Sequence, residues 1–492
     1  MFHWYMYIII YTYMQAKKRT EKRIPRSIST PAATAAAPRL TSRQLLALFR
    51  QLLPQRELWK LPSLKGTGFY RRLFTPVVTL WYLIFQRLSF DSTLQKVVAD
   101  ALAGGANSLR RGLSKKLRSA RTTSFSDARQ RVPLGFLVEA LVLQGRKILG
   151  LNQPVLWHGL AVKLLDGTTV RLRPHGDLAT TFSPQRNQSK SPPYWCLMRA
   201  VACFCAHSGA ALACALGDRS ISEQALACQL IPQILGASLY VGDRNFGVFR
   251  MVQAVRATGA HALFRLTDAR ARSLLGRTLA LGTFAILWRP TKRDQLPEDC
   301  SKEPVAGRIL VVQFQRPGYR TQRLCLFTTL TDEAAYPIKE IVALYGIRWQ
   351  VELNLRYLKD QMRLAQLDSK SADMVQKEWY AGLMAYNLIR AAMLCAGLQQ
   401  GISPLTLSFS ASRRYLQDWL SIFGQGGPDL AKAWDTMLIR ISRSPQPTRR
   451  EIRPNEPRKQ RHVREPYPPL IGSRAKARRK VRQEQLKPKI KN

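Results

Sequence analysis

Four side chains that can bind or transfer charge recur at helical spacing late in the chain: Tyr345, Arg348, Glu352 and Lys359. At about 100° of rotation per residue, all four fall within an arc of about 60° on a helix. A carboxylate in line with two cations and a phenol suits a metal ion beside a phosphate chain. For Arg348 and Glu352 alone, an ordinary surface pair at i and i+4 is the simpler alternative.

These four side chains would form a polar ridge, which requires a packed helix to hold it in place. An apolar stripe runs just beside it, formed by Leu344, Ile347, Val351, Leu355, Leu358 and Met362. This pattern predicts one helix through residues 345–359, with a buried face and a polar ridge at the edge of the core. A second apolar helix follows over residues 377–398, and we expect it to pack behind the first and fix its rotation.

Two aspartates upstream stand at the ends of predicted strands. Asp166 interrupts the apolar run AVKLLDGTTVRL, and Asp243 ends the run SLYVGD. The pattern from Ala161 to residue 268 predicts the order β-β-β-α-β-α-β, with Asp166 on the first strand and Asp243 just after the fourth. Taken alone, an Asp-Gly pair is more often a plain turn.

The spacing Y-(2)-R-(3)-E-(6)-K resembles the signature helix of the DDE-type insertion-sequence transposases, in the group named for insertion sequence four. The segments DGTTV, GDRNFG and LTDEAAYPIKEIVALYGIRWQVELNLRYLK match that group's three motif regions, and the resemblance covers about residues 45 to 400. It implies an α/β fold: a ribonuclease-H-like catalytic core with a β-rich insertion, preceded by an α-helical N-terminal domain. The first and fourth strands are neighbours in that fold, so Asp166 and Asp243 would meet, with Glu352 packed across from them.

The resemblance also implies the roles of single residues. Asp166, Asp243 and Glu352 would be the catalytic carboxylates and would hold two Mg²⁺ ions, with Mn²⁺ as a substitute. The residues expected to contact DNA are Tyr345, Arg348, Lys359, Arg244 and Trp288. Trp288 is the candidate to hold a base flipped out of the duplex, although a buried core tryptophan is the more common case.

The activity implied is cut-and-paste transposition of the element that encodes the protein, by metal-dependent hydrolysis and strand transfer without a covalent protein intermediate. The partners would be double-stranded DNA, as terminal inverted repeats and target, and a second copy of the chain in a homodimer. The protein would act in the cytoplasm and on no membrane. Two alternatives remain: an inactive, domesticated transposase-derived DNA-binding protein, and a nuclease or junction-cleaving enzyme of the same fold.

Composition agrees with a polyanionic partner. The 492 residues are 46% hydrophobic, enough for a sizeable core, and carry a formal charge of +46. This charge favours nucleic acid, although by itself it does not separate DNA from RNA or from an anionic membrane. The eight cysteines show no C-x-x-C pair and are expected to be buried thiols. Cys203, Cys205 and His207 would share one strand face, but no fourth metal ligand is apparent.

Shifts in composition divide the chain into six segments. They are 1–42, an apolar start and basic flexible linker in which Met14 is the expected initiator; 43–150, an α-helical domain; 151–268, the first part of the core; 269–332, the β-rich insertion; 333–440, C-terminal helices; and 441–492, a basic disordered tail. The basic residues of the helical domain suit either DNA contact or a solvated face: Arg71, Arg72, Arg110, Arg111, Lys115, Lys116, Arg129 and Arg131.

Overall fold

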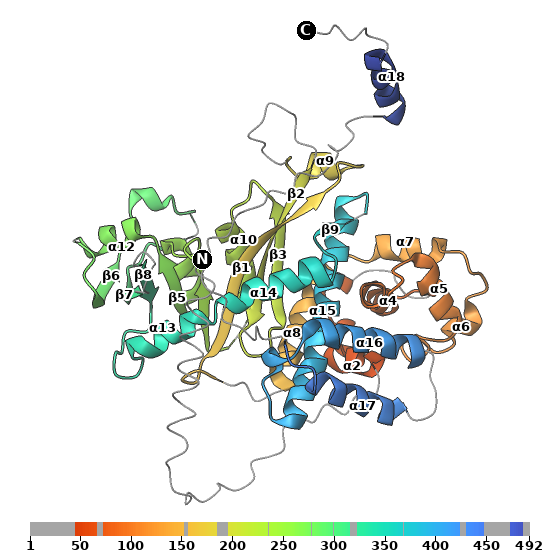
Figure 1. Ribbon diagram of the computed structural model, residues 1–492, viewed down its shortest axis with the longest axis horizontal. Coiled ribbons are helices and arrows are strands. Elements are labelled where there is room, and N and C mark those ends of the chain that lie inside the picture. The colour runs from red at the N-terminus through yellow and green to blue at the C-terminus, as the bar shows by residue number, and fades with distance from the viewer. Residues whose placement is uncertain are drawn as a thin grey trace, which may run out of the picture.

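One mixed sheet runs through the centre of the molecule (Figure 1). The computed structural model describes residues 45–65, 72–151, 156–184, 195–234, 236–276, 278–298, 300–314, 322–367, 369–423, 430–446 and 473–485. The strands are β1 (Ala161–Leu172), β2 (Cys196–Cys205), β3 (Ala211–Asp218), β4 (Ser238–Gly242), β5 (His261–Leu266), β6 (Gly282–Trp288), β7 (Val305–Phe314), β8 (Gln322–Thr328) and β9 (Gln366–Leu367). Their order across the sheet is β3-β2-β1-β4-β5-β8-β7-β6, with β9 pairing to β1.

The predicted order of strands and helices is confirmed between residues 161 and 268. Strands β2 and β3 continue from β1 as an antiparallel meander, whereas β4 pairs parallel to β1 and β5 pairs parallel to β4. Parallel pairing requires crossovers, and the helices α10 (Glu223–Leu230) and α11 (Phe249–Arg256) supply them. The sequence did not indicate the single helical turn α9 (Leu178–Thr181) or the short strand β9.

The three strands expected in the insertion are present, as β6, β7 and β8. The structure adds that they continue the central sheet, because β8 pairs antiparallel with β5 and β7 lies between β8 and β6. A helix, α12 (Asp268–Leu275), leads from β5 into this part. The insertion therefore extends the same hydrogen-bonded sheet as β1 and β4, with β5 between β4 and β8.

Side chains alternate between the two faces of β1, and each face has its own core. Leu164 packs on the face covered by α8 (Leu134–Leu151), α14 (Trp349–Arg356) and α15 (Ala372–Gln400). Leu165 packs on the opposite face with α10 and α11. Cys203 and Cys205 belong to this second core, as expected for buried thiols.

Helices form the N-terminal part, as predicted. They are α2 (Leu45–Leu52), α3 (Gln55–Leu58), α4 (Pro76–Leu88), α5 (Leu94–Leu102), α6 (Leu113–Lys116), α7 (Thr123–Arg131) and α8. Thr75 caps α4 by accepting a hydrogen bond from the Val78 amide, and Pro76 occupies the first turn, where a missing N–H costs nothing. Nearly every residue of α4 is buried, so this helix is part of the main core and not a separate surface element.

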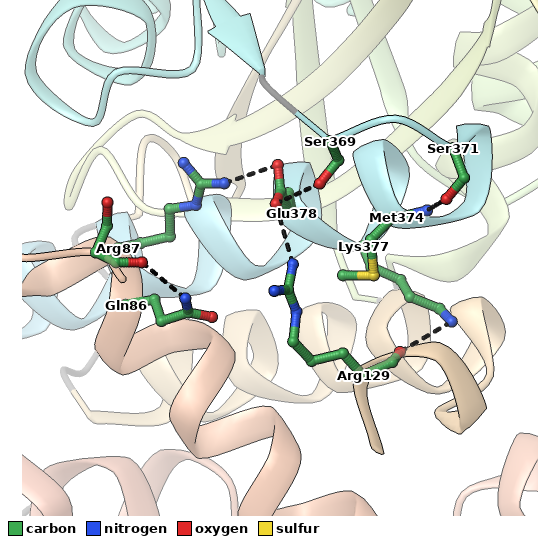
Figure 2. Close-up of polar contacts among 9 residues, drawn as sticks. Gln86, Arg87, Arg129, Ser369, Ser371, Met374, Lys377 and Glu378 are labelled. Atoms are coloured by element: carbon green, nitrogen blue, oxygen red, sulfur yellow. Dashed lines mark hydrogen bonds and ion pairs between the residues drawn. The ribbon is translucent and has the colours of Figure 1, made fainter. Parts of the chain in front are cut away.

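A buried ionic cluster joins this helical part to α15 (Figure 2). The Glu378 carboxylate pairs with Arg87 of α4 at 2.9 Å and with Arg129 of α7 at 3.2 Å, and it accepts a hydrogen bond from the Ser369 hydroxyl at 2.6 Å. Arg129 is one of the basic residues expected either to contact DNA or to lie on a solvated face. The structure instead buries its side chain to 13% exposure against Glu378, because the carboxylate compensates the charge.

Helix α15 is the central helix of the core. By length and composition it could cross a membrane, but 94% of its most apolar window is buried inside the protein. Polar side chains tie it to its neighbours: Asn387 exchanges two hydrogen bonds of 2.8 Å with the backbone of Ala211 on β3 and donates a third, of 3.1 Å, to Gln144 on α8. The position of α15 is therefore fixed against both the sheet and the N-terminal helices.

The C-terminal segments differ in part from expectation. The helices after α15 are α16 (Phe409–Phe423), α17 (Leu430–Ser442) and α18 (Arg474–Gln485). The tail from residue 441 was expected to be disordered, but α18 is a helix, and Gln446 donates a hydrogen bond to the Tyr357 hydroxyl. The expected initiator Met14 and the rest of residues 1–44 lie outside the described residues.

Candidate active site

The parallel register of β1 and β4 brings two aspartates to one place. Leu164 pairs with Val241, and Asp166 and Asp243 each lie two residues further along in the same direction. Neighbouring strands are about 5 Å apart, and even steps along a strand return to the same face. Both aspartates therefore lie on the face that α14 covers. A backbone amide binds each carboxylate: the Gly167 amide donates to Asp166 at 2.8 Å, and the Asn245 amide donates to Asp243 at 2.9 Å.

Glu352 reaches the same edge from α14, which packs on β1. The Arg348 guanidinium connects the helix to the strand, because it lies 2.7 Å from Glu352 Oε1 and 3.9 Å from Asp166 Oδ2. The i,i+4 pair of Arg348 and Glu352 therefore forms as the simple alternative expected. It is not an isolated surface pair, since the Arg348 side chain is 16% exposed and also faces Asp166.

The electrostatics of Asp166 reflect the two other carboxylates. Burial raises the pKa of Asp166 to about 7, and the negative charges of Asp243 and Glu352 add to this effect. The Gly167 amide and Arg348 oppose it. Burial disfavours the charged form of Arg348, but its neighbours Tyr345, Glu352 and Asp166 outweigh that effect and raise its pKa.

The segment predicted as one helix is not regular. Helix α13 (Ile338–Gly346) ends one residue after Tyr345, α14 begins at Trp349, and a π-helical turn, η5 (Tyr357–Gln361), follows. Between the two helices, the amides of Ile347 and Arg348 donate hydrogen bonds to the carbonyl oxygens three residues earlier in the chain, and this spacing makes the turn tighter than in an α-helix. Gly346, the last residue of α13, is a weak helix former and stands where the helix breaks.

Tyr345 and Lys359 lie at the two ends of this segment. Tyr345 is 4% exposed, so its side chain belongs to the core and not to a polar ridge. Burial raises its pKa to about 12, and Arg348 opposes the shift. Lys359 faces the site: burial lowers its pKa, Arg171 lowers it further, and Asp360 and Asp166 oppose both. Lys359 is thus positioned to bind an anion beside Asp166, whereas Tyr345 is positioned to support Arg348.

The two remaining expected DNA contacts differ in exposure. Arg244 is exposed directly after Asp243, where a phosphate can reach it. Trp288 is 2% exposed and packs edge-to-face against Phe327, with ring centroids 4.8 Å apart, and against Phe249. In this structure Trp288 is therefore a core residue and not a platform for a flipped base, because the second core encloses the indole.

A divalent cation fits these side chains by donor type. Carboxylate oxygens are the ligands that Mg²⁺ prefers, and repulsion among three acidic groups favours a cation between them. Among the described residues, no group of three or more His, Cys, Asp or Glu side chains is close enough to hold a metal ion. Arg348 instead supplies the positive charge between Asp166 and Glu352.

Glu223 and Gln224 hold the loop after β4, a role that the sequence did not indicate. Asn245 donates a hydrogen bond of 2.5 Å to Glu223 at the start of α10, and the Gln224 amide binds the Asn245 backbone carbonyl at 2.7 Å. Glu223 also packs over Gly167, where a Cβ atom would lie 2.4 Å from its carboxyl carbon. The segment S-E-Q indicates only a helix start, so nothing in the sequence pointed to this contact.

Comparison with known proteins places this site in a class. The family described as Transposase DDE domain matches residues 157–388, the region that contains Asp166, Asp243 and Glu352. This region therefore resembles a transposase DDE domain. Within that class the chain is similar to Transposase InsG for insertion sequence element IS4 of Escherichia coli (strain K12), with 27% identity over 301 residues, 56% of this chain and 66% of that relative. This match confirms the resemblance to the group named for insertion sequence four.

Two further similarities are more limited. The Putative transposase y4zB of Sinorhizobium fredii (strain NBRC 101917 / NGR234) is 34% identical over 65 residues, which are 13% of this chain and 18% of that relative. The chain thus spans less than two thirds of either relative. The cryo-EM structure of a piggyBac transposase synaptic complex with hairpin DNA aligns with 83% of this chain and 88% of that chain. The two chains are 10% identical, and the TM-score is 0.41.

Proposed function

We propose that the protein is a DNA transposase that excises and inserts its own insertion sequence by metal-dependent phosphodiester hydrolysis and strand transfer. The observation that carries the proposal is the meeting of Asp166 and Asp243 on neighbouring parallel strands, within a transposase DDE domain, with Glu352 reaching them from α14. The strand order β3-β2-β1-β4-β5 supports a ribonuclease-H-like core for residues 151–268, completed by the helices of 333–440.

The three carboxylates are the proposed ligands of two Mg²⁺ ions, with Mn²⁺ as a substitute. When bound, such ions activate the attacking hydroxyl and stabilise the leaving oxygen of an in-line displacement at phosphorus. Asp166 lies on β1 and Asp243 directly follows β4, so the sheet would fix the places of both carboxylates. Arg348 now balances the negative charge of Asp166 and Glu352. When bound cations balance that charge instead, Arg348 would be available to bind a DNA phosphate. Lys359 and Arg244 would add further phosphate contacts.

The proposed partners are the terminal inverted repeats and the target, both as double-stranded DNA. The formal charge of +46 supports tight, salt-dependent binding of phosphates. A homodimer on DNA follows from the need to cut two ends together, and the cytoplasm is the proposed site of action. Residues 43–150 are proposed to contact DNA through their exposed basic side chains, without Arg129.

The test is cleavage of duplexes that carry the ends of the element, with the wild type, Glu352→Gln and Glu340→Gln. Glu340 is a matched control, because it pairs with His158 on an exposed part of α13. We expect Mg²⁺-dependent nicking at the element end, a loss of roughly 1,000-fold in Glu352→Gln with DNA binding retained, and no change in the control.

Tight binding without cleavage by any of the three proteins would overturn the enzymatic proposal. It would favour a transposase-derived DNA-binding protein instead. Cleavage at unrelated sequences with no strand transfer would indicate a nuclease of the same fold.

A further inference from the structure

A buried arginine lies behind α14, on the side of the helix that faces the core. Arg390 of α15 is 1% exposed. Its Nε donates a hydrogen bond to the Tyr386 hydroxyl at 2.7 Å, and its Nη2 donates one to Asn354 Oδ1 at 2.7 Å. Among the described residues, no carboxylate forms an ion pair with Arg390. A buried cation without a counter-charge is costly, so its presence calls for a reason.

Aromatic rings take the place of the missing carboxylate. The guanidinium carbon lies 5.4 Å from the ring centroid of Tyr357, 5.2 Å from that of Tyr386 and 5.2 Å from that of Phe409. Ring faces stabilise a cation at such distances, and the planar guanidinium stacks on them in a way that an ammonium group does not. The three rings form an aromatic cage around the guanidinium. Tyr357 and Phe409, the first residue of α16, also stack on each other, with ring centroids 4.7 Å apart.

The other side of Arg390 is fixed by the sheet. The Tyr386 hydroxyl donates to the carbonyl of Gly209, in the turn between β2 and β3, at 2.7 Å. A Cβ atom at Gly209 would lie 2.9 Å from the guanidinium carbon, so the turn and the side chain are in close contact. Arg390 therefore has one position, set by the turn, by α15 and by α16.

Its contacts with the active-site segment are Asn354 and Tyr357. Asn354 is fully buried, lies two residues after Glu352 on the eight-residue helix α14, and also accepts a hydrogen bond from Gln350 at 3.1 Å. Tyr357 begins the π-helical turn η5 that carries Lys359. Because a helix rotates as a unit, the hydrogen bond to Asn354 sets the direction in which Glu352 points.

We propose that Arg390 is a positioning residue for the reaction: it fixes the rotation of α14 and η5, so that Glu352 and Lys359 face Asp166. The effect of Arg390 on DNA cleavage rests on the proposed function. Its effect on the position of α14 and η5 rests on the hydrogen bond to Asn354 and the contact with Tyr357. Arg390 itself does not touch the reacting groups.

The test compares matched variants of the full chain. Arg390→Lys keeps the charge but loses the planar, two-sided contact, and Asn354→Leu removes the acceptor on α14 at similar volume. Asn354→Asp is the conservative variant, because its carboxylate still accepts from Arg390. Arg308→Lys is the control: Arg308 is also 1% exposed, but it lies on β7 and binds the Leu330 carbonyl, away from the carboxylates.

We expect Arg390→Lys and Asn354→Leu to reduce the single-turnover cleavage rate at saturating DNA by about 100-fold, the loss that a 1 Å misplacement can cause. The Mg²⁺ concentration at half-maximal rate should rise, while the DNA concentration at half-maximal rate stays the same. Asn354→Asp should retain the wild-type rate within about tenfold. Arg308→Lys should lower the melting temperature without changing the rate of the folded protein.

Hydrogen exchange of residues 349–361 separates this inference from the proposed function. In metal-free protein, exchange in this segment should be faster in Arg390→Lys than in the wild type or Arg308→Lys. If the wild type cleaves no DNA but this difference appears, the proposed function fails and the positioning role stands. If Arg390→Lys matches Arg308→Lys in both rate and exchange, Arg390 is only a core residue and the inference is wrong.

Discussion

Arg348 balances the acidic side chains of the site. Its guanidinium contacts the partly exposed Glu352 at 2.7 Å and lies 3.9 Å from Asp166, and in this position it lowers the cost of burying the Asp166 carboxylate. The sequence predicted the pair with Glu352 from spacing alone. It did not predict Asp166 as the second partner, because that contact depends on how α14 packs on β1.

The raised pKa of Asp166 gives a prediction about stability and pH. The folded pKa of about 7 lies above the ordinary value of 3.8 for an aspartate, so the folded state binds a proton that the unfolded chain releases at intermediate pH. The contribution of Asp166 to stability is complete below about pH 4 and is lost as the pH rises through about 7. Asp166→Asn should therefore unfold at higher urea than the wild type at pH 8 in EDTA, by roughly 1–3 kcal/mol, and the difference should shrink at pH 4.5.

A second variant, Asp100→Asn, serves as the comparison for the stability of Asp166→Asn in urea. Because Asp100 is buried in the N-terminal helices and its pKa is also raised, to about 6, Asp100→Asn should show the same sign of effect over a lower pH range. Mg²⁺ should stabilise the wild type and Asp100→Asn but not Asp166→Asn. An Asp166→Asn protein that is less stable than the wild type at pH 8 would contradict the assigned burial cost.

At the scale of elements, the loop after β4 positions Asp243. Its backbone passes close to β5: a Cβ atom at Gly247 would lie 2.1 Å from the Arg265 carbonyl oxygen. Since that neighbour is backbone, neither side can yield without moving the strand or the loop. The glycine is visible in the sequence segment GDRNFG, but the reason for it is not.

Gly247→Ala should therefore shift the loop that carries Asp243. We expect a loss of roughly 1–3 kcal/mol in the free energy of unfolding, measured in urea, together with weaker Mg²⁺-dependent cleavage. Gly150→Ala on α8 is the control, because no atom lies within 4 Å of its added Cβ. That variant should be unchanged or up to about 1 kcal/mol more stable. Equal behaviour of the two variants would show that the loop has room to adjust.

At the scale of the whole molecule, one ionic cluster links parts of the chain that are far apart in sequence. Glu378 binds Arg87 and Arg129, and the side chains of all three residues are less than 20% exposed. The sequence marks these residues only as members of a basic helical domain and an apolar helix. Their meeting depends on how α4, α7 and α15 pack together (Figure 2).

Glu378→Gln should weaken the attachment of the N-terminal helices to the core. Two buried guanidinium groups would lose their counter-charge, at a cost of about 3 kcal/mol in unfolding free energy. The exposed pair of Glu57 and Lys147 is the control, and Glu57→Gln should change stability by less than about 1 kcal/mol. Chemical denaturation of both variants measures this difference, and an equal, small effect would mean that water reaches the cluster around Glu378.

The sequence by itself determined the order of strands and helices, the places of Asp166 on the first strand and Asp243 just after the fourth, and the apolar face of the segment around Glu352. These features follow from local periodicity, which the chain carries wherever it folds. The comparisons confirm the resemblance that the motifs suggested, whereas the roles of the site residues stay predictions.

Tertiary structure alone decided the rest. It broke the predicted helix at Ile347 and widened it at Tyr357. It buried Tyr345 and Trp288, joined the insertion to the central sheet, and placed Arg390 behind Glu352. Each of these outcomes depends on contacts between residues far apart in sequence, and a single sequence shows the residue types but not which of them meet.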